Sequence, residues 1–143
     1  MRNDTSLQRF LDAQEADYPV ALSEIQRGRK QSHWMWYIFP QLQGLGFSST
    51  SHYYGLQGSQ EAQDYAQHPV LGPRLVRISE ALLALGGSDA TRIMGSPDDV
   101  KLKSCMTLFA ALPNAHPVFQ QVLDKFFQGR PDEHTLRLLE PRS

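Results

Sequence analysis

The chain has 143 residues, of which 41% are hydrophobic and 20% charged, with 14 Lys and Arg against 15 Asp and Glu. This length is typical of one domain, and a chain of this size buries about 68–70% of the surface that its unfolded form exposes. The single cysteine, Cys105, excludes an internal disulfide framework and a zinc site built from several cysteines. Near-neutral charge argues against general nucleic-acid binding, which needs a surplus of basic residues.

No apolar run approaches the roughly 20 residues that span a membrane. The N-terminal segment, MRNDTSLQRF, lacks the apolar core of a signal peptide. We therefore expect a cytoplasmic protein that folds as one domain over residues 5–140, with no membrane partner, no metal and no cofactor. The oligomeric state stays open.

The first helices are expected near the N-terminus. Residues 5–17 carry one helical face, made of Leu7, Phe10, Leu11 and Gln14. Proline suits the first turn of a helix, because its missing N–H would have no partner there. A second helix is therefore predicted to begin at Tyr18-Pro19 and to end at Gly28.

The middle of the chain is harder to assign from periodicity. Residues 33–39 are apolar on every face, which fits either a short buried helix or a strand. Ser32 as an N-cap and Pro40 as a stop favour the helix. Three further elements are predicted: a loop over 40–48, a helix over about 50–57, and a helix over about 60–67 capped by Ser59.

The second half carries clearer helix signals. Five helices are predicted: 69–85 after His68, one turn from Asp89 to Gly95, one beginning at Ser96-Pro97-Asp98-Asp99, one from His116-Pro117 to Gly129, and one beginning at Pro131-Asp132. No alternation of β-branched residues, as is typical of strands, extends over four or more positions. The sequence therefore predicts an all-α fold, a compact single domain of about seven to nine short helices.

Half of the aromatic residues lie in one stretch, directly after a cationic one. The aromatic residues are Trp34, Trp36, Tyr37, Phe39, Phe47, Tyr53 and Tyr54, and the cationic stretch contains Arg27, Arg29, Lys30 and His33. Flat rings stack on Trp and Tyr, and Arg and Lys bind phosphate or carboxylate, so the stretch predicts a cleft for a flat anionic ligand. Gly44 and Gly46 would let backbone N–H groups approach it. The alternative is that Trp34, Trp36, Ile38 and Phe39 are core residues and that Arg29 and Lys30 are solvated.

Other candidate residues have simpler interpretations. Cys105 shares a helical face with Leu102, Met106 and Phe109, so it is expected to be a buried apolar residue rather than a nucleophile. The histidines lack metal-ligand spacing. Asp98 and Asp99 suit the first turn of a helix, and Lys101 and Lys103, about one turn further on, could reach an anion.

Three motifs together resemble one family. They are GRKQSHWMWYIFPQLQGLG at 28–46, HPVLGPRL at 68–75 and GSPDDVKLKSCMTLF at 95–109. Over about residues 7–140 the chain is similar to the bacterial domain of unknown function family 1810, which has also been called calpastatin-like. The resemblance implies a compact, mainly helical domain and no particular activity. The calpastatin label implies nothing here, because such calpain inhibitors are disordered and repetitive.

A fainter similarity is to the NADAR superfamily, largely helical proteins implicated in ADP-ribose and related N-glycoside chemistry. Two motifs carry it: SHYYGLQ at 51–57 resembles an S-E-H-Y-x-x-Q stretch, and DVKLKSCM at 99–106 with residues 117–123 resembles a K-x-x-V-M helix and its successor. Ser51 stands where that superfamily has an acidic residue, and glycoside chemistry needs a nearby carboxylate. The resemblance implies ligand binding, and catalysis only if Glu24, Glu61 or Asp99 replaces that carboxylate.

Two hypotheses from different classes follow. The first is a pocket, or an enzyme, for a nucleotide or ADP-ribose-like ligand, with His33 and His52 as general acid–base candidates because imidazole titrates near neutral pH. Its ligand-binding candidates form one expected cleft: Arg29 and Lys30 for phosphate, Trp34, Trp36 and Tyr54 for stacking, with Gln41, Lys101 and Ser104 beside them. The second is a protein-interaction module that uses the 33–47 aromatic patch, since interface hot spots favour aromatic residues and Arg.

Overall fold

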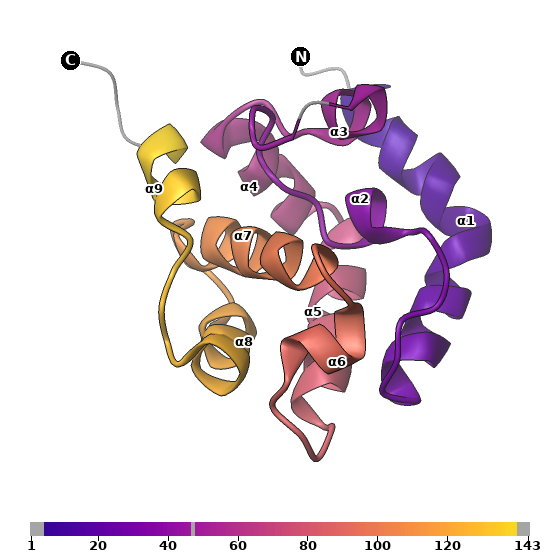
Figure 1. The fold of residues 1–143 in the computed structure, drawn as a ribbon. Coiled ribbons are helices and arrows are strands. Elements are labelled where there is room, and N and C mark those ends of the chain that lie inside the picture. The colour runs from indigo at the N-terminus through magenta and orange to yellow at the C-terminus, as the bar shows by residue number, and fades with distance from the viewer. Residues whose placement is uncertain (1–4, 47, 140–143) are drawn as a thin grey trace.

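This computed structural model describes residues 5–46 and 48–139. These ranges contain nine helices (Figure 1). They are α1 (Thr5–Gln26), α2 (Met35–Ile38), α3 (Ser49–Tyr54), α4 (Ser59–Gln67), α5 (Leu71–Leu83), α6 (Ala90–Met94), α7 (Asp98–Ala110), α8 (Pro117–Phe127) and α9 (Glu133–Leu139). The described ranges contain no strand, only an isolated parallel bridge between Leu42 and Leu56. The predicted all-α fold is confirmed. The boundaries 5–140 stay a prediction, and Glu140 and Phe47 lie outside the described residues.

The first helix is longer than predicted, because α1 runs through Pro19 without a break. A proline inside a helix removes one backbone hydrogen bond and often bends or ends the helix. Here Pro19 is exposed, and the buried face continues on both sides of it. That face contains Leu7, Phe10, Gln14, Tyr18, Ala21 and Ile25. Packing of this face against the core holds the helix together, so the separate helix predicted from Tyr18-Pro19 is wrong.

Three serines at predicted helix starts do not cap their helices. The hydroxyl of Ser32 donates to Oε2 of Glu24 at 2.6 Å, and α2 is reduced to four residues. Ser59 is the first residue of α4 rather than its cap. Ser96 precedes a cis peptide bond to Pro97, and Pro97 is the N-cap of α7. In each case the serine lies close to the helix start but another residue holds the N-cap position.

Other predicted helix ends are confirmed. Oδ1 of Asp89 accepts a hydrogen bond from Arg92 N–H at 3.1 Å and caps α6. Nδ1 of His116 accepts from Val118 N–H at 3.0 Å and caps α8. Oδ2 of Asp132 accepts from Thr135 N–H at 3.0 Å at the start of α9. These are the local side-chain contacts that satisfy the free N–H groups of a helix start.

The central helix is α7, which contacts α4, α6, α8 and α9. In Figure 1 it crosses the middle of the molecule, with α8 and α9 on one side and α2 on the other. The face predicted to be apolar is buried: Leu102, Cys105, Met106 and Phe109 are each 0% exposed. Ser104 and Thr107 are buried as well, so α7 also presents polar groups to its neighbours. Within the described ranges, no helix has both the length and the apolar character that crossing a membrane would require.

Candidate functional site

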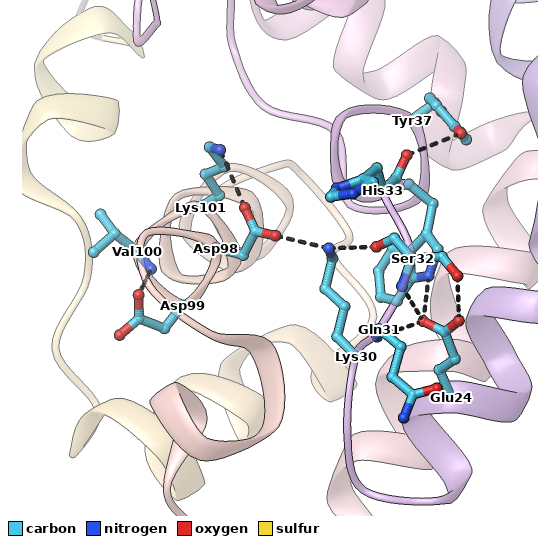
Figure 2. Close-up of polar contacts among 11 residues, drawn as sticks. Glu24, Lys30, Gln31, Ser32, His33, Tyr37, Asp98, Asp99, Val100 and Lys101 are labelled. Atoms are coloured by element: carbon cyan, nitrogen blue, oxygen red, sulfur yellow. Dashed lines mark hydrogen bonds and ion pairs between the residues drawn. The ribbon is translucent and has the colours of Figure 1, made fainter.

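A buried carboxylate fixes the turn between α1 and α2 (Figure 2). Glu24 is 4% exposed, and its Oε1 accepts from the backbone N–H groups of Gln31 at 2.8 Å and Ser32 at 2.9 Å. The indole N–H of Trp34 donates to the same oxygen at 2.9 Å. Burial alone would raise the pKa of Glu24, but these hydrogen bonds and that from the Ser32 hydroxyl outweigh it and lower the pKa to about 2. Trp34 is thereby held in the core, and Trp36 is placed two residues beyond it.

A second polar cluster attaches the same segment to the start of α7 (Figure 2). Nζ of Lys30 lies 2.8 Å from Oδ2 of Asp98, and Nζ of Lys101 lies 3.1 Å from Oδ1. Burial would raise the pKa of Asp98, but the two lysines lower it below its ordinary value. Each ammonium group also lies over an indole ring, Lys30 4.9 Å from the Trp34 centroid and Lys101 4.4 Å from the Trp36 centroid. The cluster fixes the ring of Trp36 beside α7.

A cavity of about 250 Å³ lies between the α2–α3 region, α7 and the start of α9. Its lining residues are Trp36, Gln41, Leu45, Gly46, Pro97, Val100, Lys101, Ser104, Asp132 and His134. Gly46 permits the close approach of its loop, because a Cβ there would lie 2.9 Å from Cβ of Ser51 and 3.2 Å from the ring of Trp36. Four predicted ligand-binding residues, Trp36, Gln41, Lys101 and Ser104, therefore share one cavity.

Gln41 is the unusual residue in this wall. Its side chain is 5% exposed, and its Nε2 has no hydrogen-bond partner among the described residues. Buried polar atoms in folded proteins nearly always have a partner. The backbone of Gln41 is fixed, because its carbonyl accepts from Leu56 N–H at 2.9 Å. This hydrogen bond fixes the main chain of Gln41 at the cavity wall.

Asp132 supplies a carboxylate on the opposite wall. Its Oδ2 accepts from the hydroxyl of Ser104 at 3.1 Å and from the N–H and hydroxyl of Thr135 at 3.0 and 2.5 Å. Within the described ranges, Oδ1 has no hydrogen-bond partner. The sequence predicts Asp132 only as part of a helix start and does not single out His134, which lines the same cavity. No local sequence signal relates them to Ser104, since only the packing of α9 on α7 brings these residues together.

The other predicted site residues lie elsewhere. Arg29 and Lys30 line a separate cleft at the end of α1. Trp34 is 1% exposed and belongs to the core, as do Ile38 and Phe39, so the core alternative is confirmed for these three residues. His33 and His52 are exposed on the connection before α2 and on α3, respectively. Tyr54 packs against aromatic rings, including that of Tyr37 at a centroid distance of 5.1 Å.

A mostly apolar cleft of about 570 Å³ lies between α4, α5 and the start of α8, where its lining includes Leu75, Phe109 and Phe119. It contains none of the predicted site residues. Among the described residues, no group of three or more His, Cys, Asp or Glu side chains could hold a metal ion. The smaller cavity is therefore the candidate site, because it alone has a buried unpartnered amide on a residue of its wall within the described ranges.

Fold and cavity together define an all-helical domain with a small cavity between α2, α7 and α9. The chain belongs to the family described as protein of unknown function (DUF1810), which it matches over residues 4–139. It is similar to the crystal structure of the conserved hypothetical protein Rv1873 from Mycobacterium tuberculosis, with 41% identity, coverage of 98% of this chain and 100% of that chain, and a TM-score of 0.94. None of the curated proteins compared with the chain matches it. The NADAR similarity stays a prediction.

Proposed function

We propose that the cavity between α2, α7 and α9 binds one ring of a nucleotide or ADP-ribose-like ligand. The observation that carries this proposal is that Gln41 lines the cavity while its Nε2 is buried without a hydrogen-bond partner among the described residues. An amide donor buried without a partner costs about 1–3 kcal/mol. A ligand atom that accepts a hydrogen bond from Nε2 would remove that cost on binding.

The remaining walls offer complementary groups. The indole of Trp36 provides a flat surface, and Lys101, whose Nζ is paired with Asp98, lies over this ring. Oδ1 of Asp132 can accept a hydrogen bond from a ligand hydroxyl or amine. Asp132 also provides a carboxylate in this cavity. NADAR proteins carry an acidic residue at the position that corresponds to Ser51 of this chain, where the carboxylate is missing. A donor, an acceptor and an aromatic ring suit the base or the sugar of a nucleotide.

The size of the cavity limits what it can enclose. Its volume of about 250 Å³ is below the roughly 300–1,000 Å³ of sites that bury a drug-sized ligand. One ring and its substituents fit that space, and the rest of an ADP-ribose-like molecule would lie outside it. The alternative protein-interaction module has less support, because Trp34 and Phe39 are 1% and 0% exposed. A cytoplasmic location stays a prediction.

The test compares Gln41→Met with Gln43→Met. Methionine has the length of glutamine but no amide, so Gln41→Met should raise the melting temperature of the ligand-free protein and abolish ligand binding. Wild-type protein is titrated with adenosine, AMP, ADP-ribose and NAD. A ligand at 100 times its Kd adds about 2.7 kcal/mol of stability, which raises the melting temperature by about 5–10 °C in a domain of this size.

Gln43→Met is the matched control, because Gln43 is close in sequence but its Nε2 donates to the carbonyl of His52 at 3.0 Å, outside the cavity. This variant should lose some stability and keep the ligand response. The proposal fails if none of the four compounds shifts the wild-type melting temperature at millimolar concentration. It also fails if a compound shifts wild-type protein and Gln41→Met equally.

A further inference from the structure

A second polar cleft lies on the other side of the α6–α7 connection. It has a volume of about 600 Å³, and its two walls are residues 27–30, just after α1, and residues 91–95, in and after α6. The walls are joined by a hydrogen bond from the N–H of Lys30 to the carbonyl of Ile93 at 2.7 Å. Gly28 and Gly95 form the turns at the two helix ends, with φ values of 83° and 80°. The cleft is thus built by two segments that are distant in the sequence.

Three arginines line this cleft. Arg27 and Arg29 belong to the first wall and Arg92 to the second, and all three are exposed. None of them forms an ion pair with a carboxylate in the described part of the chain, where the ion pairs involve Arg9, Lys30 and Lys101. Guanidinium groups gathered around one concave surface repel one another, and an anion bound between them removes that repulsion.

The neighbouring charged groups are already engaged. Lys30 also lines the cleft, but its side chain is 7% exposed and its Nζ is paired with Asp98 at 2.8 Å. Asp99 accepts from the hydroxyl of Thr91 at 2.5 Å, and Asp89 accepts from the N–H of Arg92 at 3.1 Å. These carboxylates reduce the positive potential near the second wall. Among the described residues, the three guanidinium groups are then the cations of the cleft without an ion-pair partner, and Nε of Arg27 donates to the carbonyl of Ser23 at 3.4 Å.

Helix ends explain part of this arrangement. Arg27 follows the last turn of α1 and Arg92 lies in the last turn of α6, where a helix favours a cation. This explanation does not cover Arg29, and it does not require the three side chains to share a cleft. A guanidinium presents paired N–H donors that match the oxygens of a phosphate group, and several of them match a diphosphate better than a single carboxylate.

We infer that this cleft is an anion site for the phosphate groups of a phosphorylated small molecule, with Arg29 and Arg92 as its principal ligands. The sequence predicts Arg29 and Lys30 as phosphate ligands. In the structure Lys30 is paired with Asp98, and Arg92 lines the cleft together with Arg29. The inference stands on this cleft alone and does not depend on the proposed cavity function. If both hold, the two sites flank residues 95–97 and could receive two parts of one ligand.

The test is a calorimetric titration of the full chain with inorganic pyrophosphate at a constant ionic strength of about 0.15 M, where bulk screening acts over roughly 8 Å. Wild-type protein should bind with a Kd of about 1 mM or lower, and Arg29→Gln and Arg92→Gln should each weaken binding by about tenfold or more. Arg130→Gln is the control, because Arg130 is exposed and lies outside this cleft. It removes the same charge and should leave binding unchanged.

Three results would overturn the inference: no saturable binding by the wild type at 10 times the expected Kd, equal weakening in Arg130→Gln, or unchanged binding in both cleft variants. Adenosine separates this site from the cavity, because it carries no phosphate. Pyrophosphate binding without any nucleoside or nucleotide binding refutes the cavity proposal and supports the cleft. Adenosine binding without pyrophosphate binding refutes the cleft inference and supports the cavity proposal.

Discussion

Replacing Glu24 with glutamine should remove a pH-dependent part of the protein's stability. The glutamine carbonyl can take the place of Oε1 and accept from Gln31, Ser32 and Trp34, and its amide can donate to the Ser32 hydroxyl. The shape and number of contacts are then preserved, and the negative charge is lost. The folded-state pKa of Glu24 is about 2, against an ordinary value of 4.5. This difference corresponds to about 3 kcal/mol of stability contributed by the ionised carboxylate.

The sign of the pH dependence follows from the lowered pKa. Because the folded protein holds the carboxylate ionised, its contribution is complete well above pH 4.5 and is lost as the pH falls toward 2. At pH 7, Glu24→Gln should therefore be less stable than wild type by about 3 kcal/mol. At pH 3 the difference should shrink to about 1.5 kcal/mol. Other carboxylates titrate in both proteins, so the difference isolates Glu24.

Urea unfolding followed by circular dichroism at pH 7, 5, 4 and 3 measures this difference. Glu15→Gln is the matched control, because Glu15 is exposed on the same helix and should change stability by less than about 0.5 kcal/mol at each pH. A stability difference between wild type and Glu24→Gln that stays constant from pH 7 to pH 3 would refute the reasoning. Equal stability at pH 7 would refute it as well.

Two further predictions concern the core. Cys105 is 0% exposed and burial raises its pKa well above the ordinary value, so a thiol reagent at pH 7 should label the native protein slowly and the urea-unfolded protein rapidly; rapid stoichiometric labelling of the native protein would contradict this. Gly72→Ala should lower stability by about 1–3 kcal/mol in urea unfolding, because a Cβ at Gly72 would lie 2.2 Å from the carbonyl oxygen of Ala66. Gly86→Ala is its control, since a Cβ there meets no described atom within 4 Å, and equal effects of the two variants would contradict the packing argument.

The helix ends that the sequence predicted correctly depend on local contacts. Asp89, His116 and Asp132 each accept a hydrogen bond from a backbone N–H two or three residues ahead. Such a contact needs nothing from the rest of the chain, so residue type and position predict it. Ser32 has the same residue-level signal, but its hydroxyl donates to Glu24, eight residues earlier. The Ser32 hydroxyl bonds the buried carboxylate of Glu24 on the preceding helix, and no local sequence pattern identifies this pair.

The aromatic segment shows why the site was only partly predictable. Trp34 and Trp36 stand two residues apart in one motif, yet Trp34 is in the core and Trp36 in the cavity wall. A helix of four residues has too little periodicity to separate its faces. Residue type was enough to select Trp36, Gln41, Lys101 and Ser104 as candidates for one site. The carboxylate opposite them, Asp132, depends on how α9 packs on α7, which sequence spacing does not encode.

A comparison inside the molecule strengthens the argument for Gln41. Gln14 is as deeply buried, at 1% exposure, and its amide is fully used: Nε2 donates to the carbonyl of Tyr37 at 2.7 Å and to the hydroxyl of Tyr65 at 2.9 Å, and Oε1 accepts from Arg74 at 3.3 Å. The side-chain amide of a buried glutamine that contacts only core residues therefore finds its hydrogen-bond partners within the protein. Gln41 is held by its own backbone in a wall that faces a cavity, and its Nε2 has no such partner within the described ranges. An unpaired donor at a fixed position beside a cavity is expected where a ligand, rather than the protein, supplies the acceptor.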